Sequence, residues 1–107
     1  MNRIIQLKTD DVIIDPAAQS EMITEACCRS ARKLAVTGIC QCGDTVIAAL
    51  EPSETEKDYV YVLSPFSSLN LDEIVTEIST RYFSGFSLIG GFDVKNQKLA
   101  LFAGEKK

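Results

Sequence analysis

The sequence contains no histidine, and this absence removes several functions at once. Histidine is the most frequent general base beside a catalytic nucleophile and a frequent ligand of zinc. The chain also lacks a G-x-S-x-G nucleophile elbow and a phosphate-binding loop that runs from a strand into a helix. We therefore expect a protein that is not an enzyme, with catalysis by carboxylates or by a single thiol as the formal alternative.

Long apolar runs are missing as well. No stretch approaches the roughly 20 residues that a membrane-spanning helix needs, and Met1–Ile5 lacks the pattern of a secretory signal. The net charge is -4 and the sequence pI is about 4.7, with Lys and Arg scattered along the chain. A nucleic-acid binder needs clustered cations, so we expect a soluble, cytoplasmic protein that contacts neither membrane nor nucleic acid.

The remaining composition is that of an ordinary globular protein. Of 107 residues, 46% are hydrophobic and 24% are charged, which suits one domain over residues 1–107 with one core.

A helix followed by a hairpin is the clearest local pattern. Asn70 and Glu73 form the two ends of a capping box, and Gly85 is a typical residue after a helix end. Phe86–Val94 and Lys98–Ala103 then predict two strands around a polar turn. One apolar stripe at helical spacing runs along the helix: Leu71, Ile74, Val75, Ile78 and Tyr82.

The first half of the chain follows a related order. Arg3–Lys8 predicts a strand, and Thr9–Asp11 a turn. Val12–Ile14 fits either a sheet edge or a segment docked on the core. Asp15 and Pro16 begin a helix that we expect to reach about Lys33. Its expected buried residues are Met22, Ile23, Ala26, Cys27, Ser30 and Leu34.

Three more strands are expected in the centre of the chain. Leu34–Cys42 and Thr45–Leu50 flank a tight turn at Gly43, and Tyr59–Leu63 is rich in aromatic and β-branched residues. Glu51–Asp58 is polar and contains a proline, so we expect a solvated linker there.

An internal repeat connects the two halves. Four residues recur with the same spacing of 52: Thr24 with Thr76, Glu25 with Glu77, Arg29 with Arg81, and Gly38 with Gly90. The half-repeats are about 1–50 and 58–104, joined by the linker 51–58. We therefore expect an α+β fold, in which two βαββ halves form a mostly antiparallel sheet with two helices on one face.

The four cysteines are expected to pack rather than to bind metal. Adjacent helical residues point about 100° apart, so Cys27 and Cys28 cannot easily reach one ion. We interpret Cys27 and Cys40 as small buried hydrophobic residues, with Cys42 as a further candidate, and Cys28 as the exposed thiol. No metal and no cofactor is expected.

Two glycines lie within the expected strand that follows the second helix. Because phosphate-binding loops run from a strand into a helix, this order favours a bulge or a bend in the strand. A bend could make room for a ligand, and the nearby arginine could pair with an acidic metabolite or a nucleotide. The candidate ligand-binding residues are Arg81, Tyr82, Gly90 and Gly91.

Several strands fail to alternate between apolar and polar residues, which indicates that both of their faces are covered. We expect a second copy, as a homodimer, to cover the face that the helices leave free. Intrachain closure of the two halves is the alternative. The candidate interface residues are Ile47, Ala49, Ala100 and Phe102.

The sequence therefore favours a small non-enzymatic binding or regulatory module that acts through protein contacts. A small-molecule binding protein is the alternative function. No motif in the chain names a family.

Overall fold

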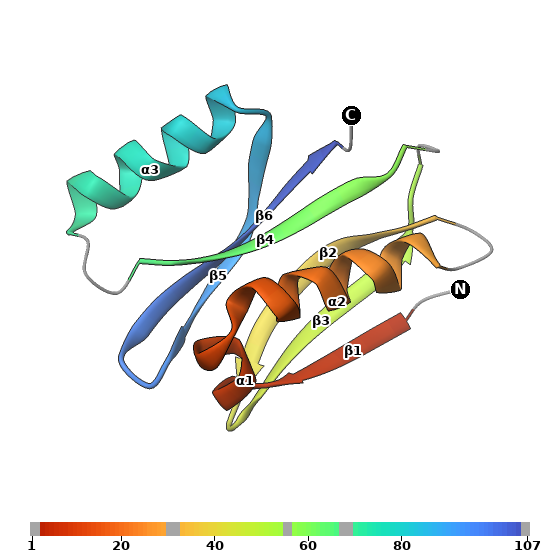
Figure 1. Ribbon diagram of the computed structural model, residues 1–107, viewed down its shortest axis with the longest axis horizontal. Coiled ribbons are helices and arrows are strands. Elements are labelled where there is room, and N and C mark those ends of the chain that lie inside the picture. Colours follow the sequence, from red (N-terminus) through yellow and green to blue (C-terminus); the bar gives the residue numbers. More distant parts are fainter. Residues whose placement is uncertain (1–2, 30–32, 55–56, 67–69, 106–107) are drawn as a thin grey trace.

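The computed structural model describes residues 3–29, 33–54, 57–66 and 70–105. Over these residues the chain is α+β, with two three-stranded antiparallel sheets and three helices (Figure 1). The bounds in chain order are β1 Arg3–Lys8, α1 Thr9–Ile14, α2 Pro16–Cys28, β2 Leu34–Cys42, β3 Thr45–Pro52, β4 Tyr59–Pro65, α3 Leu71–Phe83, β5 Phe86–Val94 and β6 Gln97–Glu105.

Each sheet is built from one hairpin and the strand that precedes it in its half of the chain. The orders are β1-β3-β2 and β4-β6-β5. Each hairpin contains one register shift, between Val36 and Gly38 in β2 and between Leu88 and Gly90 in β5. The expected single sheet is wrong, because β1 and β4 each pair with their own hairpin and each remains an edge strand.

Local sequence explains both hairpin turns. Gly43 has φ +61°, and Lys95 and Asn96 have φ +46° and +67°. Positive φ at the centre of a two-residue turn matches the right-handed twist of the flanking strands. The ends of β2, β3 and β5 at these turns agree with the sequence prediction.

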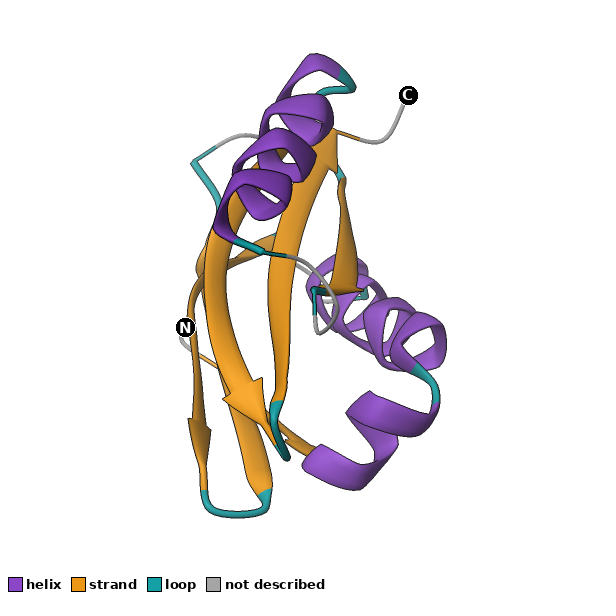
Figure 2. Cartoon of the chain, turned by 90° about the vertical axis from the view of Figure 1, so that its left-hand side faces the viewer, coloured by secondary structure: helices purple, strands orange, loops and turns teal. Residues whose placement is uncertain are grey.

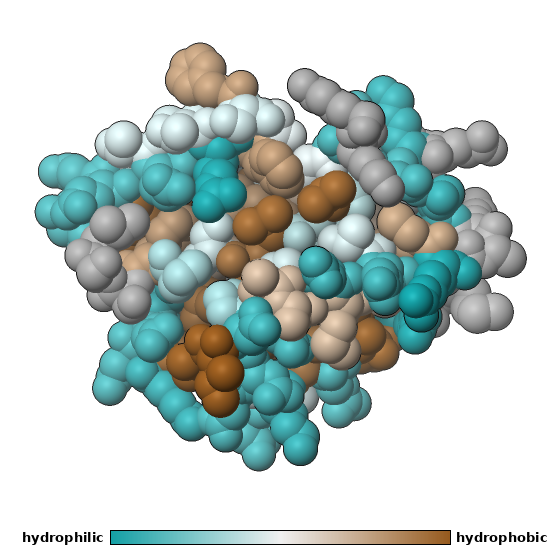
Figure 3. Space-filling model, in the orientation of Figure 1, coloured by the Kyte–Doolittle hydropathy of each residue, from teal (hydrophilic) through white to brown (hydrophobic). Residues whose placement is uncertain are grey.

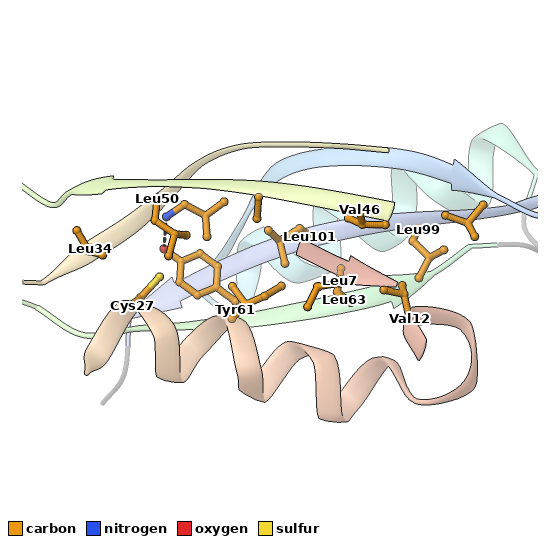
Figure 4. Close-up of a cluster of buried hydrophobic side chains, with 14 residues drawn as sticks. Leu7, Val12, Cys27, Leu34, Val46, Leu50, Tyr61, Leu63, Leu99 and Leu101 are labelled. Atoms are coloured by element: carbon orange, nitrogen blue, oxygen red, sulfur yellow. Dashed lines mark hydrogen bonds between the residues drawn. The ribbon is translucent and has the colours of Figure 1, made fainter. Parts of the chain in front are cut away.

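The main core lies where the two sheets face each other (Figure 4). It combines residues of both sheets with residues of α1 and α2: Leu7, Val12, Ile23, Cys27, Leu34, Val36, Val46, Ala48, Leu50, Tyr61, Leu63, Val94, Leu99 and Leu101. The inner faces of both sheets are therefore covered by the chain itself. Intrachain closure, the alternative to a dimer, explains why the residues on these inner faces are apolar.

A second, smaller cluster lies on the other face of the β4-β6-β5 sheet. Phe66, Ala100 and Phe102 are buried there, and Ile74 and Ile78 of α3 pack against them. The α2 residues belong to the core between the sheets, whereas the α3 residues belong to this outer cluster. The expectation that two helices share one face is therefore not met, and Figure 2 shows α3 at the top, well away from the two lower helices.

Some element bounds differ from the sequence prediction. Residues 9–14 form α1 rather than a turn, since Val12 is fully buried while the acidic first turn suits a helix N-terminus. Helix α2 ends at Cys28 instead of near Lys33, and Met22 is 51% exposed. Ser30, expected to be buried, lies outside the described residues. Strand β3 continues to Pro52, which shortens the expected linker.

The two sheets approach each other most closely at strands β2 and β5. A Cβ added to Gly90 of β5 would lie 3.0 Å from Ile39 Cγ2 of β2. Nearby, the Val36 amide donates a hydrogen bond of 2.9 Å to the Tyr61 hydroxyl, which links β2 to β4 across the core. These contacts fix the relative position of the halves. Within the described residues, no helix is long and apolar enough to cross a membrane.

Candidate protein-binding surface

Helix α2 covers the outer edge of β4 with two side-chain hydroxyls. The Leu63 amide donates to Ser20 Oγ at 2.9 Å, and the Tyr61 amide donates to Thr24 Oγ1 at 3.0 Å. An edge strand exposes alternate amides that invite pairing with another chain. The two hydroxyls satisfy these amides, so a helix replaces the missing neighbour strand.

Simple geometry allows this match. Four residues of a helix rise about 6 Å, and two residues of a strand rise about 6.6 Å, so hydroxyls four apart meet amides two apart. Each hydroxyl also donates back along the helix, Ser20 to Pro16 O at 2.7 Å and Thr24 to Ser20 O at 3.0 Å. This fixes the hydroxyl hydrogen and leaves the oxygen free to accept. Sequence reasoning missed the pair, although hydroxyls four apart on a buried helix face are a readable signal.

A shallow groove of about 450 Å³ runs beside this seam, between α2 and β4. Val60 and Val62 of β4 and the acidic residues Glu21 and Glu25 of α2 are among its lining residues. Figure 3 shows apolar residues gathered in the middle of this face, between α3 above and α2 below. The groove is open and holds no described cluster of side chains suited to catalysis.

Helix α3 exposes much of its apolar surface. Leu71 is 75% exposed, Val75 55%, Tyr82 55% and Phe83 94%. We call these four residues the α3 outer surface. Only Ile74 and Ile78 of the expected stripe pack on the chain, and none of the helix residues is fully buried. The predicted apolar stripe is therefore only partly covered, with Leu71, Val75 and Tyr82 more than half exposed.

The helix nevertheless has strong local stabilisation. Glu73 N donates to Asn70 Oδ1 at 2.9 Å, and the Glu73 side chain accepts from the Asn70 amide, which confirms the predicted capping box. Gly85 has φ +89°, as expected for a residue that follows a helix end. The α3 outer surface is thus presented by a well-formed helix.

Two further hydroxyls of α3 repeat the bonding seen in α2. Thr76 Oγ1 donates to Asp72 O at 2.9 Å, and Thr80 Oγ1 donates to Thr76 O at 3.0 Å. Both threonines are exposed. Their oxygens can accept, and no group in the described part of the chain donates to them.

Strand β1 is an edge strand without such a cover. The Thr9 amide donates to Asp44 O at 2.9 Å, which places odd-numbered amides on the β3 side. Successive amides alternate across a strand, so those of Ile4, Gln6 and Lys8 face away from the sheet. All three side chains are exposed, and no side chain in the described ranges accepts from these amides.

The four predicted ligand-binding residues do not form one site. Arg81 Nε binds Glu77 Oε1 at 3.2 Å, and Arg81 Cζ lies 5.3 Å from the centre of the Phe102 ring. This is the outer face of the β4-β6-β5 sheet. Gly90 pairs with Leu101, whose side chain belongs to the core on the opposite face, and the space beside it is taken by Ile39. Gly91 pairs with Ala100 and Tyr82 points to solvent.

The four predicted interface residues separate into two pairs. Ala100 is 4% exposed and Phe102 is fully buried, both beneath α3, so a second copy cannot reach them. This corrects the expectation for those two residues, because α3 covers the sheet face that was expected to be free. Ile47 and Ala49 are half-buried on the outer face of β3, where their role stays a prediction.

The four cysteines differ in their exposure to solvent. Cys27 is buried as predicted, whereas Cys40 and Cys42 are exposed, which corrects the prediction. They pair with Ile47 and Thr45 on the outer face of the edge strand β2. Cys28 is partly exposed. Within the described residues, no three side chains of the types that bind metals lie together.

Burial changes the acidity of two groups in the core. It raises the pKa of the Cys27 thiol to about 11 and the pKa of the Tyr61 hydroxyl to about 12. Figure 4 shows Tyr61 next to Cys27. A thiol with a raised pKa is a poor nucleophile.

Comparisons with protein-family models, with curated proteins and with solved structures found no match to this chain.

Proposed function

We propose that this protein is a small non-enzymatic binding module that acts through protein contacts made by the α3 outer surface. The observation that carries the proposal is the exposure of four large apolar side chains, Leu71, Val75, Tyr82 and Phe83, each more than half exposed on one helix of 13 residues. Scattered exposed apolar residues are ordinary, but a group on one helix is typical of a contact surface.

The stability of α3 supports this proposal. Its capping box, the Arg81–Glu77 ion pair and the packing of Ile74 and Ile78 hold the helix in place without covering the outer surface. Because the helix is already formed, binding a partner costs little conformational entropy for ordering α3. Recognition of one face of an amphipathic helix is a recurring mode of protein contact.

We also propose that the two halves are an internal repeat of the βαββ type. The support is the shared strand order, first-third-second, together with matching register shifts at Gly38 and Gly90, which are 52 residues apart. The repeat matters for function because it makes α2 and α3 equivalent helices, whose surroundings can then be compared. In the first half, α2 covers the edge strand of the other sheet; in the second half, α3 has no such strand.

Replacement of Val75 by Asp tests the proposal. The charge lies in the middle of the α3 outer surface, where a partner would have to remove its water. The matched control is Ile14→Asp, which changes another exposed apolar residue, 80% exposed on α1. The wild type and both variants are immobilised, and an extract of the native source is passed over each.

We expect the wild type and the control to retain the same proteins, and Val75→Asp to lose them. Retention that is equal on all three would contradict the proposal. A rise in the melting temperature on adding nucleotides or acidic metabolites, abolished by Arg81→Ala, would instead support the small-molecule alternative.

A further inference from the structure

We propose that the open edge of β1 is covered by α3 of a second copy of this chain. The proposal goes beyond the proposed function, because it concerns the polar side of α3 that carries Asp72, Thr76 and Thr80 and lies beside the α3 outer surface. It joins two features at distant places in the molecule, since β1 and α3 lie at opposite corners of Figure 1. Within the described residues, the open amides of β1 lack helix hydroxyls to accept from them, and the hydroxyls of α3 lack strand amides that donate to them. The contact between α2 and β4 contains both groups.

The contact between α2 and β4 is the template. There, hydroxyls four residues apart on a helix accept from amides two residues apart on an edge strand. Thr76 and Thr80 have the same spacing and the same backward hydrogen bonds as Ser20 and Thr24. The open amides of β1 have the same spacing as those of β4.

The direction of the template sets the register. On α2 and β4 the higher-numbered hydroxyl meets the lower-numbered amide, so helix and strand run in opposite directions. In the second-copy contact, Thr80 then faces the Ile4 amide and Thr76 faces the Gln6 amide, so the first turn of α3 lies towards Lys8. This register places Asp72 near Lys8 of the other copy.

Charge supports α3 as the occupant. The first turn of α3 carries Asp72 and Glu73, both exposed, whereas β1 carries Arg3 and Lys8. Opposite charges at such a contact favour the right partner and exclude wrong ones. A second β1 strand, the other simple occupant of an open edge, would bring the same two cations into the seam and is disfavoured by their repulsion.

Exchange of the two charges tests the contact. Light scattering measures the mass of the wild type, Lys8→Glu, Asp72→Lys and the double variant across micromolar concentrations. We expect the wild type to exceed the mass of one chain, and each single variant to associate about tenfold more weakly or worse. The double variant, and an equal mixture of the two single variants, should recover the wild-type mass, because each contact again pairs opposite charges.

Thr76→Val keeps the shape of the side chain but removes the accepting oxygen, so it should also weaken the association. Melting temperatures of all variants check that the fold is intact. A wild type with the mass of one chain would overturn the proposal. An assembly that Lys8→Glu weakens and Asp72→Lys leaves unchanged would also overturn it, and would indicate pairing between two β1 strands. A monomer that still captures a different protein through Val75 would overturn this inference and leave the proposed function standing.

Discussion

The hydroxyl oxygen of Ser20 lies 2.9 Å from the amide nitrogen of Leu63, where a neighbouring strand would otherwise supply a carbonyl. This contact, with its counterpart between Thr24 and Tyr61, ends the sheet at β4 and attaches the first half of the chain to the second. The same hydroxyl spacing on α3 meets no amide within the described residues. The two helices therefore differ in one respect: the hydroxyls of α2 meet an edge strand, and those of α3, in the described part of the chain, do not.

Removal of the Ser20 hydroxyl should destabilise the fold. Ser20 is 7% exposed, and in Ser20→Ala the buried Leu63 amide loses its acceptor. We expect a loss of about 1–3 kcal/mol in the free energy of unfolding, measured by denaturant titration. Ser79→Ala, at an exposed position of α3, controls for the higher helix propensity of alanine and should be neutral or slightly stabilising. Equal effects of the two changes would refute the role of Ser20 at the strand edge.

The two register shifts should differ in their tolerance of a methyl group. A Cβ at Gly90 would meet Ile39 Cγ2 at 3.0 Å, whereas a Cβ at Gly38 meets nothing within 4 Å. Gly90→Ala should therefore cost about 1–3 kcal/mol of stability, as overpacked cores do, and Gly38→Ala much less. The pair is compared by thermal or denaturant unfolding. A larger loss of stability in Gly38→Ala than in Gly90→Ala would show that the sheets do not approach most closely at Gly90.

Truncation to alanine should reduce stability much more at a buried apolar residue than at an exposed one. Leu50 is fully buried between the sheets, so Leu50→Ala should cost about 2–5 kcal/mol. Val75 is 55% exposed, so Val75→Ala should change the stability of the single chain by less than about 0.5 kcal/mol. Denaturant titration at a concentration where the protein is a single chain measures both. A large loss at Val75 would contradict the exposure of the α3 outer surface.

Stability should fall at alkaline pH through Cys27 and Tyr61. Both pKa values are higher in the folded than in the unfolded chain, so both groups bind protons more tightly when folded. The resulting stabilisation is complete below about pH 9, the ordinary range of the Cys27 thiol. It is lost as the pH rises through about 11 for Cys27 and about 12 for Tyr61.

Cys27→Ala should flatten the first part of this decline. Unfolding free energies at several pH values between neutral and strongly alkaline measure the slope for the wild type and the variant. Identical slopes between about pH 9 and 11 would show that the Cys27 thiol does not contribute.

Local patterns in the sequence predicted local structure well. The capping box at Asn70, the end of α3 before Gly85 and the turn at Gly43 follow from the conformational preferences of a few adjacent residues. Their physical cause lies within a few residues of each site. The bounds of β1 and β2 agree with the sequence for the same reason.

The arrangement of these elements could not be predicted in the same way. Helical spacing identified the apolar stripe of α3 but not how much of it is covered, so Ile78 packs while Tyr82 is exposed. Strands without alternation indicated two covered faces. The sequence could not decide whether the cover was a second copy or, as for Phe102, the chain's own helix. The separation of Gly90 from Arg81 likewise depends on which face each strand residue occupies, which tertiary packing decides.

Residue-resolved amide hydrogen exchange of the wild type at two protein concentrations tests the central claim most directly. The Leu63 and Tyr61 amides, covered by α2 within the chain, should be protected equally at both concentrations. We predict that the Ile4 and Gln6 amides of β1 exchange rapidly when dilute and become protected at the higher concentration, together with slower exchange in α3. Rapid exchange of the β1 amides at every concentration at which light scattering detects an assembly would contradict the account.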